Sequence, residues 1–87
     1  MNKEVEVLNT ELARRETELA EYDLNIKIYT TAITVARTRS NTEEFQGQLE
    51  KLLTDTVAQR LKSEIMLITI QELLNDCEVN RRGNNPA

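Results

Sequence analysis

Apolar side chains recur at alternating spacings of three and four residues from Val5 to Ala36, and this seven-residue repeat constrains the fold more than any other feature. Charged residues, mostly glutamates, lie between them up to Asp23. Such a stripe is typical of an amphipathic helix that packs along another helix. The sequence therefore predicts a helix over residues 3–38. Its contact stripe consists of Val5, Leu8, Leu12, Arg15, Leu19, Tyr22, Ile26, Tyr29, Ile33 and Ala36.

The repeat stops after this helix, because the next positions in register are Ser40, Glu43 and Gly47. Ser40 with Glu43, or Asn41 with Glu44, has the spacing of a helix-initiating capping box. We therefore expect a turn at residues 39–42. The segment contains neither glycine nor proline to force a reversal, so a kinked continuous helix is the alternative.

Spacings of three and four resume in the second half and predict a helix over residues 42–78. Beyond it, residues 79–87 lack periodicity, which predicts a flexible C-terminal tail. The predicted apolar face of the second helix is wider than that of the first. It consists of Phe45, Leu49, Leu52, Leu53, Val57, Leu61, Ile65, Ile68, Leu73, Leu74 and Cys77.

Two such helices joined by a short turn predict an all-α, antiparallel, coiled-coil-like hairpin over residues 1–78. Two glycines and one proline are too few for a turn-rich all-β fold. A small α+β fold is the alternative, because residues 24–35 and 65–70 are rich in β-branched side chains. The helical interpretation is preferred because the repeat runs through residues 22–36 without a change of phase.

One seam between two helices cannot bury all the apolar side chains. The surplus predicts self-association into a helical bundle or docking on a helical protein partner. The residues expected at that interface are Leu24, Ile28, Val35, Met66, Leu67 and Ile70.

The composition argues against several kinds of chemistry. The chain has no histidine and one cysteine, Cys77, so neither a multi-thiolate metal site nor an intrachain disulfide is expected. We also expect no cofactor and no enzymatic activity, because no nucleophile–base pair can be named. Arg15 is expected to fix the helix register by pairing with Glu11, Glu18 or Glu64. A mid-helix polar group could line a pocket with Arg15; its members are Thr56, Gln59, Arg60 and Ser63.

The charge distribution is uneven, although the net charge is only −4. Residues 1–23 carry seven acids and three bases, whereas residues 24–42 carry three bases and no acid. An acidic chain without a basic stripe is a poor ligand for duplex nucleic acid. The acid-free segment supports one ligand-binding hypothesis, a site for a phosphate-containing small molecule or nucleotide. Its candidate residues are Lys27, Thr30, Thr31, Thr34, Arg37 and Arg39.

No apolar run approaches the roughly 20 residues that a membrane span needs, and the N-terminus has no signal-peptide core. We therefore expect a soluble, cytoplasmic protein. The preferred function is that of a non-enzymatic interaction module. It would act as a small oligomeric assembly subunit, adaptor or inhibitor through helix–helix contacts.

Overall fold

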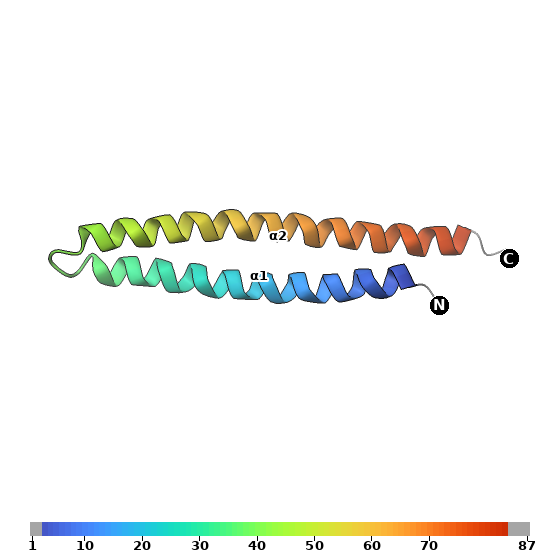
Figure 1. Ribbon diagram of the computed structural model, residues 1–87, viewed down its shortest axis with the longest axis horizontal. Helices are drawn as coiled ribbons and strands as arrows, with labels where there is room; N and C mark the ends of the chain where they lie inside the picture. The colour runs from blue at the N-terminus through green and yellow to red at the C-terminus, as the bar shows by residue number, and fades with distance from the viewer. Residues whose placement is uncertain (1–2, 84–87) are drawn as a thin grey trace.

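Two long helices lie side by side in a computed structural model of the chain (Figure 1), which describes residues 3–83, with side chains to residue 78. Helix α1 spans Lys3–Ala36 and α2 spans Glu43–Gly83. The molecule is 72 Å long and about 15 Å thick. The predicted all-α antiparallel hairpin is confirmed, and the described residues contain no strand, so the α+β alternative is wrong.

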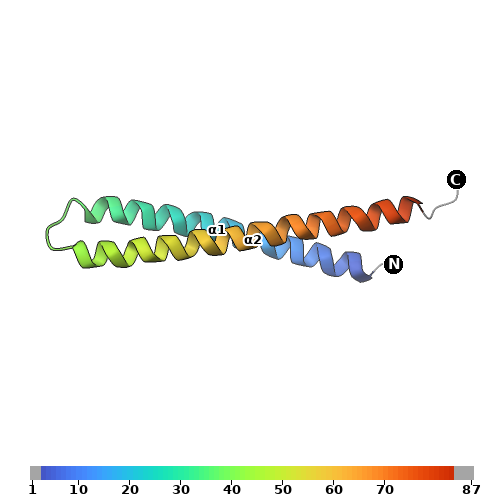
Figure 2. The same ribbon diagram turned by 90° about the horizontal axis from the view of Figure 1, so that it is seen from above.

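The helix boundaries differ slightly from those predicted. The connection covers residues 37–42, so α1 ends two residues earlier than expected. Helix α2 continues to Gly83, so residues 79–83 are helical where a tail was predicted. The last four residues of that predicted tail lie outside the described part of the chain. In Figure 2, turned by a quarter, the two helices cross at a shallow angle near the middle, as expected for a seam with a seven-residue repeat.

The chain reverses at Asn41, whose φ of 62° lies in the left-handed region. Asparagine tolerates this conformation better than other side chains with a Cβ atom, which explains a tight reversal without glycine. Neither predicted capping box is seen. Instead the Thr42 hydroxyl donates a 2.7 Å hydrogen bond to the Ala36 carbonyl, and Gln46 Nε2 donates to Thr42 Oγ1 at 2.9 Å. Thr42 thereby joins the end of α1 to the start of α2.

The seam of α1 is the predicted one, since every residue of the predicted stripe is half-buried or buried, with Ile33 and Ala36 the most buried. Residues on α2 also become less exposed at alternating spacings of four and three, which is the matching repeat. Its seam begins at Thr42, just before the helix, and continues with Gln46, Leu49, Leu53, Thr56, Arg60, Ser63, Leu67, Ile70, Leu74 and Cys77.

The predicted apolar face of α2 is therefore partly wrong. Leu49, Leu53, Leu74 and Cys77 do face α1, but seven other members are exposed: Phe45, Leu52, Val57, Leu61, Ile65, Ile68 and Leu73. Successive spacings of four, as in Val57–Leu61–Ile65, make a stripe drift around a helix, so these residues cannot stay on one seam with Leu49. Polar Thr56, Arg60 and Ser63 occupy the middle of the seam instead.

Candidate functional site

The middle of the seam contains a polar cluster built by both helices. Ser63 is only 2% exposed, and its Oγ donates to Glu18 Oε2 at 3.2 Å. The same carboxylate oxygen accepts a 3.2 Å hydrogen bond from Arg15 Nη1. Arg15 Nε lies 3.8 Å from Glu11 Oε2. Arg15 thus pairs with two of its three expected partners, Glu11 and Glu18.

The third expected partner, Glu64, binds a different arginine. Arg60 Nη1 donates to Glu64 Oε2 at 2.7 Å, and Arg60 Nε donates to Asp23 Oδ1 of α1. These two hydrogen bonds raise the pKa of the Arg60 guanidinium above its ordinary value. The Arg60–Asp23 and Ser63–Glu18 contacts fix the register, which brings Ile33 opposite Leu49 and Leu12 opposite Ile70.

The carboxyl group of Glu18 experiences opposing effects. Burial raises its pKa, but a hydrogen bond from Arg14, the charge of Arg15 and the hydrogen bond from Ser63 together outweigh that effect. The net pKa lies below the ordinary value of 4.5. The polar cluster therefore holds Glu18 as a carboxylate and joins the two helices through it.

We expect this cluster to make hairpin stability depend on pH. Because the pKa of Glu18 is lowered in the folded state, its contribution is present above about pH 4.5 and is lost as pH falls through the folded pKa. The melting temperature of Glu18→Gln, followed by circular dichroism, should fall less than that of wild type between pH 5.5 and 3.5.

Glu21→Gln is the matched control, because Glu21 is exposed on the same helix and makes no ion pair with any described residue. This variant should follow the wild-type pH profile. Parallel profiles for Glu18→Gln and wild type would contradict the assignment.

The two flanks of the seam differ in chemistry. On α2, the flank that follows the seam residues is mostly charged or polar: Glu43, Glu50, Val57, Glu64, Gln71 and Glu78. Ion pairs cross it to α1, with Arg37 Nη2 lying 3.7 Å from Glu50 Oε1 and Arg60 binding Asp23. Charged side chains therefore cover the seam on this side of α2, which we call the charged flank.

The opposite flank of α2 is apolar. We define the flank stripe as Phe45, Leu52, Met66 and Leu73, each of which directly precedes a seam residue. These positions follow a seven-residue spacing, and Gln59 occupies the central position between Leu52 and Met66. These side chains are 41–53% exposed. The flank stripe leaves an apolar edge beside the seam along most of α2.

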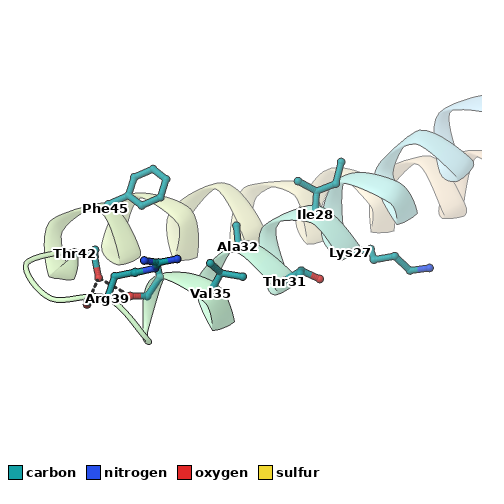
Figure 3. Close-up of a pocket in the computed structure, with 9 residues that line it drawn as sticks. Lys27, Ile28, Thr31, Ala32, Val35, Arg39, Thr42 and Phe45 are labelled. Atoms are coloured by element: carbon teal, nitrogen blue, oxygen red, sulfur yellow. Dashed lines mark hydrogen bonds between the residues drawn. The ribbon is translucent and has the colours of Figure 1, made fainter.

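Near the turn this edge widens into a groove of about 670 Å³ between the two helices (Figure 3). Phe45 forms one wall, and Ile28, Ala32 and Val35 of α1 form the other. Figure 3 shows Arg39 extending from the turn toward Val35, and Lys27 at the far end of the groove pointing away from it.

A second set of exposed apolar side chains lies farther round α2. We define the outer stripe as Leu61, Ile65 and Ile68 together with Val57, the apolar member of the charged flank; these side chains are 46–56% exposed. The structure thus gives α2 two apolar surfaces that α1 does not cover.

The structure separates the predicted interface residues into two groups. Leu24, Ile28, Val35 and Met66 are exposed and available to a partner. The prediction is wrong for Ile70, which is 4% exposed, because it points into the hairpin seam, where the half-buried Leu67 also lies. Phe45, Leu52 and Leu73, predicted for the internal seam from their spacing, are exposed and become further interface candidates.

The six predicted ligand-binding residues are not brought together. Lys27, Thr31 and Arg39 line the groove, whose other lining atoms are mainly apolar. Arg37 turns to Glu50 on the charged flank, and the Thr34 hydroxyl donates to the Thr30 carbonyl at 3.2 Å. Binding of a phosphate-containing ligand stays a prediction.

No family model matches the chain, and neither a curated protein nor a solved structure matches it. Within the described residues, neither helix contains a stretch long and apolar enough to cross a bilayer. The same residues contain no cluster of carboxylates and thiols placed to hold a metal ion.

Proposed function

We propose that this protein is a non-enzymatic interaction module, a small oligomeric assembly subunit, adaptor or inhibitor that acts through its exposed helix faces. The observation that carries the proposal is the orientation of the apolar residues of α2. The flank stripe and the outer stripe both face solvent in a single hairpin, while few apolar side chains are buried.

The energetics favour association. Among the described residues the buried apolar side chains are Ile33, Ala36, Leu49 and Ile70. A core this small seldom contributes more than about 3–5 kcal/mol of stability. Each large exposed apolar side chain gains roughly 1.5–3 kcal/mol when it is buried. The stripe residues are about half exposed, so each gains about half of that amount. Packing a stripe of four against another helix pair therefore offers a stabilisation comparable with that of the hairpin's own core, before the entropy cost of association.

The polar seam cluster also suits a bundle subunit. Arg15, Glu18 and Ser63 fix which residues of α1 and α2 lie opposite each other, as single polar seam positions do in coiled coils. A fixed register keeps the flank stripe in line on one edge. A partner therefore meets one defined surface rather than a sliding pair of helices.

Native mass tests this proposal directly. Light scattering after size exclusion, repeated across micromolar concentrations, should give at least twice the chain mass of 10.0 kDa. The melting temperature should also rise with protein concentration, because association stabilises the folded chain by mass action. A stable monomer with a concentration-independent melting temperature would refute the oligomeric module.

A further inference from the structure

The flank stripe has the same pattern in both directions along α2. From its centre at Gln59, the stripe has Leu52 seven residues before and Met66 seven residues after, and Phe45 and Leu73 lie one further repeat away. An antiparallel copy of α2 therefore presents an apolar side chain opposite every apolar side chain, and Gln59 opposite Gln59. This self-complementarity is what a two-fold interface requires.

We propose that a second copy of this chain packs on the flank stripe, antiparallel, about a two-fold axis that passes beside Gln59. The proposal rests on the oligomeric function above and names the surface and the orientation. Phe45 meets Leu73 of the other copy, and Leu52 meets its Met66. The two Gln59 amides, each with a donor and an acceptor, can hydrogen-bond to each other at the axis.

The contrast between the two flanks supports this choice of surface. Apolar residues beside a seam extend the buried face of a coiled-coil helix and favour bundles of more than two helices, whereas charged flanks remain in solvent. On α2 the charged flank already pairs with α1 through Glu50 and Arg37, and the seam residue Arg60 joins Glu64 of this flank to Asp23 of α1. The flank stripe has no such cover among the described residues, and its residues are at least 41% exposed.

Charge complementarity supports the antiparallel orientation. The turn end belongs to the acid-free segment 24–42 with its three bases, and Lys27 and Arg39 line the groove there. The opposite end of α1 belongs to segment 1–23, with seven acids against three bases. Glu43 and Glu50, also at the turn end, lie on the opposite flank of α2, so the cationic side of the turn end is the side with Lys27 and Arg39. An antiparallel pair places this side beside the acidic end of α1 of the other copy. A parallel pair would place like charges together.

The groove near the turn can accept side chains of the other copy. Ile28, Val35 and Phe45 line it, and in the proposed pair Leu73 of the second copy lies at the same level. The groove is then filled at both ends of a symmetric four-helix bundle. The outer stripe stays on the surface of that bundle, where a different partner can reach it.

A disulfide at the axis tests the proposal. In a Cys77→Ser background, Gln59→Cys brings two thiols together if two copies of α2 meet at this point. Mild oxidation of Gln59→Cys should give a covalent dimer on a non-reducing gel in near-complete yield. Ala58→Cys is the matched control, because residue 58 is also exposed and adjacent but faces away from the flank stripe. It should remain mostly monomeric on the gel.

Leu52→Cys separates the two orientations, because residue 52 meets its own copy in a parallel pair but lies roughly 20 Å from it in the antiparallel pair. Leu52→Cys should therefore stay mostly monomeric on the gel, and its efficient cross-linking would contradict the antiparallel arrangement.

The outcomes separate this proposal from the general one. A native oligomer in which Gln59→Cys does not cross-link, or in which Ala58→Cys cross-links preferentially, overturns the flank-stripe dimer and leaves the oligomeric function standing. A monomeric native mass together with no cross-link overturns both. Circular dichroism of each variant establishes that the helices are retained, so a missing cross-link reports on the arrangement of the copies.

Discussion

Leu49→Ala should lower the free energy of unfolding by about 2–5 kcal/mol, the range for removing a buried leucine side chain. Leu49 is 6% exposed and lies in the seam opposite Ile33. A hairpin with so few buried apolar residues loses most of its stability with this one side chain. Urea denaturation followed by circular dichroism, at a fixed low protein concentration, measures the loss.

Leu61→Ala is the matched control for this substitution. It removes the same atoms from the same helix, but Leu61 is 56% exposed and belongs to the outer stripe. Its free energy of unfolding should change by less than about 1 kcal/mol. Equal losses for the two variants would mean that Leu61 lies in the seam, and the register of α2 described above would be wrong.

Leu52→Glu combined with Met66→Glu should raise the dissociation constant of the proposed dimer by more than about a hundredfold. Each apolar side chain contributes roughly 1.5–3 kcal/mol when buried, and each substitution occurs twice in a two-fold dimer. The new carboxylate at position 52 of one copy would also face the new carboxylate at position 66 of the other. Sedimentation equilibrium measures the dissociation constant.

Two further variants make this experiment specific. Val57→Glu with Ile65→Glu changes the outer stripe by the same charge and should leave the dissociation constant nearly unchanged. Leu52→Lys with Met66→Glu should recover part of the lost affinity, because an antiparallel pair sets each lysine beside a glutamate of the other copy. Dissociation by the outer-stripe variant, or no recovery by the charge swap, would contradict the antiparallel flank-stripe pair.

The first helix could be predicted almost residue by residue because its repeat is nearly all apolar. The Val5–Ala36 stripe predicted the seam, and Arg15 was correctly placed in it. The turn was predicted close to its observed place, but its chemistry was not. Neither the left-handed conformation of Asn41 nor the hydrogen bond from Thr42 to Ala36 leaves a periodic trace in the sequence.

The seam of α2 was harder to predict because its repeat passes through polar residues. The strict alternation of spacings was present in the sequence, running from Gln46 to Cys77 by way of Thr56, Arg60 and Ser63. Hydrophobicity alone instead favours the nearby Val57, Leu61 and Ile65 as seam residues, and these were the residues predicted. The missing signal was electrostatic, since Glu18 and Asp23 on α1 need polar partners at the facing positions.

The same polar residues explain why the candidate site could be predicted only in part. The surplus of apolar side chains predicted an interface. Three of the residues predicted for it, Ile28, Val35 and Met66, are indeed exposed. Which other residues belong to that surface depends on the rotation of α2 about its axis. That rotation is fixed by contacts between residues far apart in the sequence, and no local pattern contains it.

The position of the buried residues beside the turn has a consequence for how the chain acquires its structure. Ile33, Ala36 and Leu49 meet across a short loop, so the entropy lost in bringing them together is small. Contacts at the other end, where Val5 and Leu74 line one surface hollow, close a loop of nearly the whole chain. The hairpin should therefore form first at Asn41 and close progressively toward its open end. Closure past the polar cluster at Ser63 should bury the least apolar surface of any step.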